Sequence, residues 1–281
     1  MHYQEFQPNS ILSKFIECFW LLESSDKKSQ TEPQKILPDG CIELLFHFKS
    51  LNRRFISDDE SIAEPRSFFS GQIKRSIMIQ STGAVGVLGV RFRPAGAYPF
   101  LRLPIVELTE KVIDLTEIWG RVGRELNSRI LESTTNQERI RHAECFLLNR
   151  LDQKIAEDVI VRQALVEIIR AKGQTSIDFL MRNIGISGRH LERKFDQLVG
   201  LTPKTFSRII RFQNVFDLLS KNHFQHLTIL ALQCGFYDQA HFIHEFKEFT
   251  GQSPTAYFSN KHKIAALFTS SDRMSVFYNS A

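Results

Sequence analysis

Residues 184–203 read IGISGRHLERKFDQLVGLTP and residues 234–254 read CGFYDQAHFIHEFKEFTGQSP, and these two stretches decide the fold of the C-terminal part of the chain. Both begin near a glycine. Both end with phenylalanine, glycine and proline at identical spacing, at Phe195, Gly200 and Pro203 and again at Phe246, Gly251 and Pro254. The repeat predicts two copies of one helical unit within residues 176–254.

Each copy has the features of a helix-turn-helix, which needs a tight turn at a fixed place between two helices. Gly185 and Gly235 predict that turn, because glycine tolerates the positive φ that other residues resist. Ser187 and Asp238 follow, and their side-chain oxygens can cap the first free N–H groups of the next helix. We therefore expect the two second helices to begin directly after these caps.

The repeat resembles the DNA-binding domain of the AraC/XylS family of transcription regulators, in which two helix-turn-helix units are joined by a long helix. The residues that carry the resemblance are Ile229, Leu230, Ala231, Cys234, Gly235, Phe236, Asp238, Gln239, Phe242, Phe246, Lys247, Gly251, Ser253 and Pro254, and the first copy matches them at the spacing. A tandem pair with matched spacing, over roughly 95 residues, is a specific signal. The resemblance implies sequence-specific binding of double-stranded DNA, with RNA polymerase as a further partner.

The first predicted recognition helix has its apolar residues at core spacing, so the residues between them project outward. By the resemblance, Arg189, Glu192 and Arg193 match positions that reach base edges, and His190 lies on the same outward side. Arginine can bind guanine bidentately, and glutamate can accept from cytosine. The alternative is an Arg–Glu surface ion pair.

The second predicted recognition helix has phenylalanines at core spacing, which leaves Gln239, His241, His244 and Glu245 exposed. By the resemblance, Gln239 and His244 match base-reading positions, and a glutamine can bind adenine bidentately. His241 is expected at a base or a phosphate. Two histidines three residues apart can hold a metal, but the sequence offers no third ligand, so no metal is expected.

A helix joins the two units. Thr202 is placed to cap it and Pro203 to begin it, and it extends to about residue 221. Its positive residues Lys204, Arg208 and Arg211 are expected near the DNA backbone, with a plain solvated helix face as the alternative.

Length and composition favour two domains, because the chain has 281 residues of which 42% are hydrophobic. The net charge of +5 comes mainly from residues 174–281, which hold 12 Lys+Arg against 8 Asp+Glu. That excess fits nucleic-acid binding and equally fits a solvated surface. Four separated cysteines without a CxxC pair predict buried free thiols. The lack of a signal pattern and of an apolar run of about 18 residues predicts a cytoplasmic protein with no membrane partner.

Residues 1–103 have the pattern of short strands and turns, which predicts a barrel or sandwich. Strands are expected at 15–22, 41–48, 68–72, 75–81 and 84–93, with a loop from 23 to 34 and a turn at 37–40. Alternation in the strand 41–48 puts Ile42, Leu44 and Phe46 on one face and Glu43, Leu45 and His47 on the other.

The stretches LPDGCIEL at 37–44 and GVRFRPAGA at 89–97 resemble a cupin-like N-terminal domain found on a subset of AraC-type regulators. In the wider family such domains sense a small molecule or mediate dimerisation, so the resemblance implies a small-molecule effector or a homodimer without naming a ligand. A metal-bearing cupin needs several histidines, whereas residues 1–141 contain only His2 and His47. We therefore expect no cofactor.

A polar group is expected inside this domain. Glu43, Arg91 and Arg93 are its candidate members, and alternation that puts both arginines on one strand face is compatible with an anionic effector. Trp20 is a candidate to line the pocket. The alternatives are a structural ion pair for the charged residues and core packing for the tryptophan.

The sequence predicts an α+β chain: a cupin-like β-barrel domain at 1–103, a helical linker at 104–156, a DNA-binding domain of two helix-turn-helix units at 157–262, and an unassigned tail at 263–281. Thr135 and Glu138 predict a capping box in the linker, whose apolar faces pack on the barrel or on a second subunit. We expect a non-enzymatic, effector-responsive DNA-binding regulator. The competing interpretations are a binding or enzymatic cupin-like protein with an accessory DNA-binding module, and an alkyl-transfer repair protein, which would need a cysteine-zinc cluster that is not evident.

Overall fold

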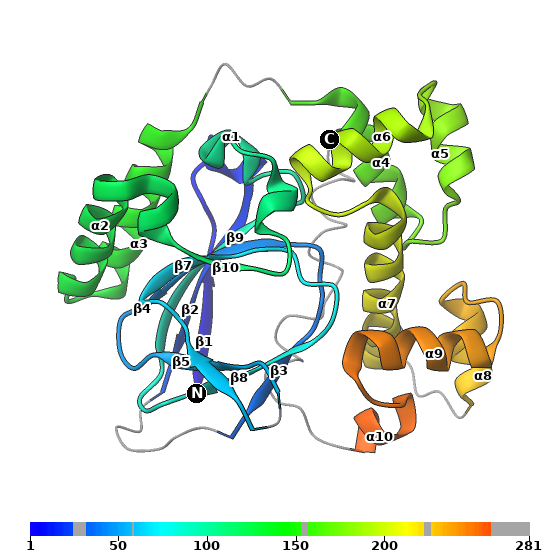
Figure 1. Ribbon diagram of the computed structural model, residues 1–281, viewed down its shortest axis with the longest axis horizontal. Coiled ribbons are helices and arrows are strands. Elements are labelled where there is room, and N and C mark those ends of the chain that lie inside the picture. Colours follow the sequence, from blue (N-terminus) through cyan, green and yellow to red (C-terminus); the bar gives the residue numbers. More distant parts are fainter. Residues whose placement is uncertain (25–31, 58, 153–156, 222–225, 260–281) are drawn as a thin grey trace.

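The computed structural model describes residues 1–24, 32–57, 59–152, 157–221 and 226–259. An N-terminal β domain carries a pair of helices on one side and faces a C-terminal helical region on the other (Figure 1). The predicted α+β class is confirmed. The tail after residue 259 and most of the predicted loop at 23–34 lie outside the described residues.

Within the described residues, ten strands form two antiparallel sheets. The six-stranded sheet has the order β1 (His2–Phe6), β2 (Ile16–Glu23), β9 (Gly86–Phe92), β4 (Ile42–His47), β7 (Ser67–Ser70) and β10 (Val112–Asp114). The four-stranded sheet has the order β3 (Gln34–Ile36), β8 (Ile77–Ser81), β5 (Asn52–Phe55) and β6 (Ser61–Ala63). All five predicted strands are present. The strands that were not predicted are short or polar and lack the alternation that marks a half-buried strand. One of them, β10, lies where a helical linker was expected.

The six-stranded sheet has two different faces, as the alternation in β4 predicts. Ile42, Leu44 and Phe46 pack with α1 (Tyr98–Leu101), η1 (Leu12–Lys14), η2 (Ile105–Leu108), α2 (Leu115–Glu132) and α3 (Asn136–Arg150) in one core. Glu43, Leu45 and His47 face the four-stranded sheet. The apolar faces of α2 and α3 thus pack on the sheet of their own chain.

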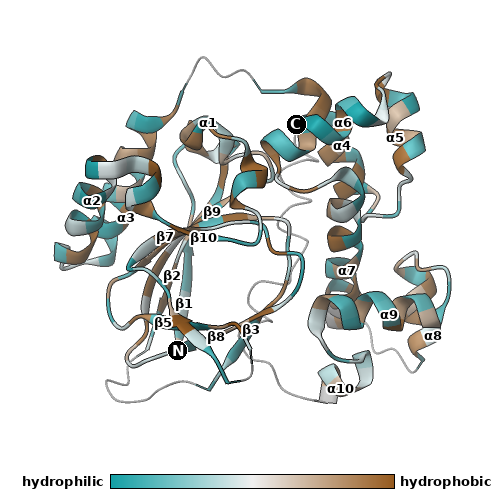
Figure 2. Cartoon of the chain, in the orientation of Figure 1, coloured by the Kyte–Doolittle hydropathy of each residue, from teal (hydrophilic) through white to brown (hydrophobic). Residues whose placement is uncertain are grey.

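Capping fixes the ends of this helical pair. Thr135 and Glu138 form the predicted capping box of α3, and Asp114 with Glu117 forms a second one at the start of α2. Figure 2 shows apolar and polar residues alternating along α2, which buries Trp119 against Phe69 at a ring-centroid distance of 5.1 Å. One expectation fails here, because Cys145 on α3 is exposed while the other three cysteines are buried.

The helical region contains two helix-turn-helix units around one long helix (Figure 1). After α4 (Val159–Arg170), the first unit is α5 (Ile177–Ile184) with α6 (Gly188–Leu198), and the second is α8 (Leu227–Gln233) with α9 (Gln239–Thr250). Between them runs α7 (Pro203–Lys221), and α10 (Pro254–Ser259) follows the second unit. Gly185 and Gly235 adopt φ of 74° and 78°, so the turn glycines have the predicted conformation.

Within the described ranges, no helix is both long and apolar enough to cross a membrane. Over the same ranges, no group of three or more His, Cys, Asp or Glu is arranged to hold a metal ion.

Candidate DNA-binding surface and effector cavity

The first recognition helix, α6, presents the outward face that its sequence predicts. Ser187 caps it by accepting from the His190 backbone N–H, and Leu191 and Phe195 are fully buried. Arg189, Glu192 and Arg193 are exposed, and His190 is half-exposed. These side chains are therefore open to a ligand as large as DNA, and their contact with bases stays a prediction.

The second recognition helix, α9, is capped by Asp238, which accepts from the His241 backbone N–H at 2.7 Å. His244 is exposed, whereas Gln239 and His241 are half-exposed. Glu245 was expected to be exposed and is buried, because Arg208 Nε and Arg211 Nη2 donate to it at 2.8 and 2.9 Å. Burial alone would raise the pKa of Glu245, but these arginines hold it below its usual value.

Two of the three α7 residues that were expected near the DNA backbone have a structural role that the sequence did not reveal. Arg208 donates to Glu245 and to Glu248, and Arg211 donates to Glu245, so both guanidinium groups join α7 to α9. Lys204 remains exposed. A recognition helix tied to the joining helix keeps its angle, which matters for entry into a groove.

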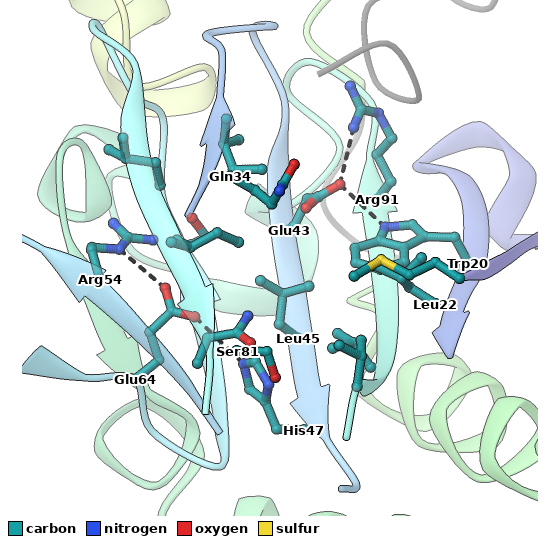
Figure 3. A pocket seen from close by; sticks show the side chains of 18 of the residues that line it. Trp20, Leu22, Gln34, Glu43, Leu45, His47, Arg54, Glu64, Ser81 and Arg91 are labelled. Carbon is teal, nitrogen blue, oxygen red and sulfur yellow. Dashed lines mark hydrogen bonds and ion pairs between the residues drawn. The ribbon is translucent and has the colours of Figure 1, made fainter. Parts of the chain in front are cut away.

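A cavity of about 100 Å³ lies between the two sheets, and Figure 3 shows the side chains that enter it from both. Trp20, Leu22, Leu45 and Val87 line it from the six-stranded sheet, and Ile36, Ile77 and Ile79 line it from the other. The indole of Trp20 lies flat on β9, because a Cβ at Gly89 would stand only 2.0 Å from it. Trp20 therefore lines the cavity as well as packing in the domain.

One end of the cavity is lined by Arg91, Glu43 and Asp39, and Figure 3 shows Arg91 beside Glu43. Arg91 Nε meets Glu17 at 3.1 Å, Nη1 meets Glu43 at 3.0 Å, and Nη2 meets Asp39. Glu43 and Arg91 are opposite each other in the β4–β9 register, and their predicted ion pair is present. A register shift between Ile16 and Cys18 accompanies the placement of Glu17 beside Arg91, as a β-bulge re-aims a side chain.

The electrostatics of this end are dominated by burial. Burial raises the pKa of Glu43 to about 7, with Asp39 acting in the same direction and Arg91 and Trp20 in the opposite one. Trp20 Nε1 donates to Glu43 Oε1 at 3.2 Å. Burial would lower the pKa of Arg91, but the surrounding acidic groups, Asp39 foremost, raise it well above its usual value.

The other end of the cavity holds a second buried polar group. Glu64 accepts from Arg54 Nε at 3.1 Å and lies 3.5 Å from His47 Nε2. Arg93 is not among the residues that line the cavity: β9 ends at Phe92, and Arg93 donates to the Ser13 carbonyl at 2.9 Å. We expected Arg91 and Arg93 on one face of the same strand. That expectation is wrong, because strand β9 ends at Phe92, before Arg93.

The N-terminal domain is hydrogen-bonded to α7, to α9 and to the residue that follows α6. Gln72 Nε2 donates to the Gly40 carbonyl at 2.9 Å and to the Val199 carbonyl at 3.1 Å, at the end of α6. Gln213 of α7 donates to the Pro38 carbonyl. Ser76 N–H donates to the Phe249 carbonyl of α9 at 2.8 Å. Sequence reasoning missed these contacts, because single polar residues in loops carry no periodic signal.

Two family models match parts of the chain. Residues 4–114 match one described as a domain of unknown function (DUF6597), and residues 180–260 match one described as a helix-turn-helix domain. The second match covers both predicted recognition helices. No curated protein matches the chain.

Several solved structures are similar at low identity. ToxT from Vibrio cholerae is 11% identical with a TM-score of 0.44, over 85% of this chain and 98% of that chain. ToxT with a bound unsaturated fatty acid is 13% identical with a TM-score of 0.42, over 85% and 94%. The AraC-like transcriptional activator CuxR is 15% identical with a TM-score of 0.26, over 77% and 87%. At these scores the similarities carry no functional argument.

Proposed function

We propose that this chain is a transcription regulator of the AraC type that places α6 and α9 in neighbouring DNA grooves under the control of a small molecule held between its two sheets. The match of residues 180–260 to a helix-turn-helix domain supports this. One observation supports this most strongly. Strand β3, which lines the cavity, holds the C-terminal end of the recognition helix α9 on its other side.

Strand β3 has this double role. Gln34 and Ile36 line the cavity, while Lys35 between them points the opposite way and donates from Nζ to the Thr250 carbonyl at the end of α9. Successive side chains of a strand point to opposite faces, so a ligand that moves β3 also moves Lys35. Occupancy of the cavity can thereby shift α9.

The loop 37–41 has the same double role toward α7. Asp39 pairs with Arg91 at the cavity, while the carbonyls of Pro38 and Gly40 accept from Gln213 and Gln72. Gly40 also packs so closely on Phe206 that an added Cβ would lie 2.7 Å from that ring. A ligand that disturbs the pair of Asp39 and Arg91 would therefore act directly on a loop docked against α7.

On the DNA side, the proposed base-reading residues are Arg189, Glu192, Arg193, Gln239 and His244, with His190, His241 and Lys204 at bases or phosphates. Arg208 is proposed to act mainly by fixing α9. RNA polymerase as a partner, a homodimer, a cytoplasmic location and the absence of enzymatic activity are further parts of the proposal, on the strength of the family resemblance. We propose domain boundaries near residues 103, 156 and 262.

Selection from random-sequence DNA tests the DNA-binding part. The purified chain should recover one recurring site, and the double variant Arg193→Ala with His244→Ala should recover none. Arg121→Ala is the control, because this arginine is exposed on α2, where it pairs with Glu125. A parent chain that enriches no site would refute the proposed function.

A further inference from the structure

We propose that the cavity between the sheets binds a small organic amine, with an apolar body between the sheets and a cationic nitrogen on Glu43. This ligand class deepens the proposed function and rests on it, because it names the effector whose site that function requires. Three features favour an amine: the apolar walls of the cavity, the charges at its ends, and the hydrogen-bond acceptors inside it that have no donor among the described residues.

The charge at the Arg91 end favours a cation. Three carboxylates, from Glu17, Asp39 and Glu43, surround the single guanidinium of Arg91, and each occupies one of its nitrogens. When all three are ionised, this end has two more negative charges than positive ones. A buried charge that lacks a partner is costly, so a ligand cation would relieve the imbalance.

Glu43 is the carboxylate best placed to receive the cation. Its side chain is 20% exposed, against 16% for Asp39 and 8% for Glu17. Oε1 of Glu43 accepts from Trp20 and Arg91, whereas Oε2 has no hydrogen-bond partner among the residues that the structure describes. An ammonium group at Oε2 would gain a charge-assisted hydrogen bond beside the indole of Trp20.

His47 offers a second open acceptor in the same cavity. It is 1% exposed, and its Nδ1 has no hydrogen-bond partner within the described part of the chain. Nε2 also has no hydrogen-bond partner there and lies 3.5 Å from Glu64 Oε2; in the tautomer that carries its proton on Nε2, Nδ1 is an acceptor. Glu43, Leu45 and His47 alternate on one face of β4, so the two acceptors lie at opposite ends of an apolar floor.

An anionic ligand fits this cavity poorly. Both arginines that line it are already paired, Arg91 with three carboxylates and Arg54 with Glu64 at 3.1 Å. An incoming carboxylate would have to displace one of these groups and would add to the excess of negative charge. The walls, in contrast, are mostly aromatic and aliphatic and suit the apolar part of an amine.

Three probes of one shape test the ligand class: 2-phenylethylamine, 3-phenylpropionate and 2-phenylethanol, titrated calorimetrically into the full chain without DNA. The experiment is done above pH 7, where Glu43 is ionised. The amine should bind roughly 10- to 100-fold more tightly than the other two, as expected for one charge-assisted hydrogen bond. Equal binding of the three, tighter binding of the acid, or no binding of any would overturn the proposal.

Two variants locate the site. Glu43→Gln should remove the preference for the amine, while Glu125→Gln, at an exposed position on α2, should keep it. Leu45→Phe adds a ring to the cavity floor and should abolish amine binding, which gives a second test if Glu43→Gln does not fold. The proposed site is contradicted if the Glu43→Gln variant still prefers the amine, or if the Leu45→Phe variant still binds it.

DNA selection by the same preparation separates the two proposals. If the chain selects a DNA site but shows no preference for the amine, only the inferred ligand class is refuted. If the chain prefers the amine but selects no DNA site, the proposed function is refuted.

Discussion

Lys35 Nζ donates a hydrogen bond to the Thr250 carbonyl oxygen at 2.7 Å, which ties a strand of the cavity to the last residue of a recognition helix. The carbonyls at a helix C-terminus lack intrahelical partners and carry the negative end of the helix dipole. Lys35 is only 8% exposed, and burial lowers its pKa. A buried cation at this place both satisfies a carbonyl and fixes α9 to the β domain.

Lys35→Met should lower the free energy of unfolding by about 1–3 kcal/mol, because the Thr250 carbonyl loses a charged donor. Urea unfolding measures the change. Lys49→Met is the matched control, since Lys49 pairs with Glu23 at the surface and its loss should cost about 1 kcal/mol or less. Equal effects of the two substitutions would show that Lys35 does not hold α9.

Arg193→Ala should weaken specific DNA binding by about 1–3 kcal/mol and relax the preference at one base position, as expected for the loss of a bidentate contact with guanine. Lys204→Ala should weaken binding to all sequences alike and reduce the salt dependence by about one phosphate contact. Binding measured on a set of single-base site variants distinguishes the two patterns. An Arg193→Ala chain that binds every variant as tightly as the parent would remove α6 from base readout.

The DNA site should be directional, should cover nearly two turns per chain and should bend on binding. The helix α7 has 19 residues, which at about 1.5 Å each span roughly 28 Å, less than the ~34 Å between successive major grooves of straight DNA. Bending the DNA site costs a deformation free energy on the order of 1–6 kcal/mol, which the added protein–DNA contacts can offset. Gel migration of permuted fragments together with a footprint measures both features. An unbent duplex with a footprint of one half-turn would rule out this geometry.

The contribution of Glu43 to the free energy of unfolding should decrease as the pH rises from about 5 to about 7. Burial raises the pKa of Glu43 from an ordinary 4.5 to about 7, so between these values the folded chain holds a proton that the unfolded chain has released. The groups that face Glu43 are Arg91 on β9, Asp39 in the loop 37–41 and Trp20 on β2, and Glu17 on β2 pairs with the same Arg91. Urea unfolding at several pH values measures the slope.

Glu43→Gln is the comparison for that slope. The difference in unfolding free energy between parent and variant isolates Glu43, because the other titrating groups are common to both. The parent should lose stability relative to the variant as the pH rises through this window. A difference that stays constant, or that changes in favour of the parent, would mean that Glu43 is ionised throughout.

Local signals in the sequence determined the turns of the helical region and the starts of its recognition and joining helices. Gly185 and Gly235 mark the turns, Ser187 and Asp238 cap the recognition helices, and Pro203 begins the joining helix at the residue that the structure gives. Turn geometry and capping depend on residues a few positions apart, so they can be predicted without a tertiary structure. The alternation that separates Ile42, Leu44 and Phe46 from Glu43, Leu45 and His47 has the same local origin.

Only the tertiary structure decided which distant groups meet. Glu17 and Asp39 join Glu43 around Arg91, Arg93 stays apart from them, and Glu245 is buried by Arg208 and Arg211 although its position on the helix suggested exposure. Lys35 meets Thr250 across 215 positions of the sequence. Such pairings arise from strand register and from the docking of the helical region on the β domain. These are sums of many long-range contacts, and no periodic pattern in the chain encodes them.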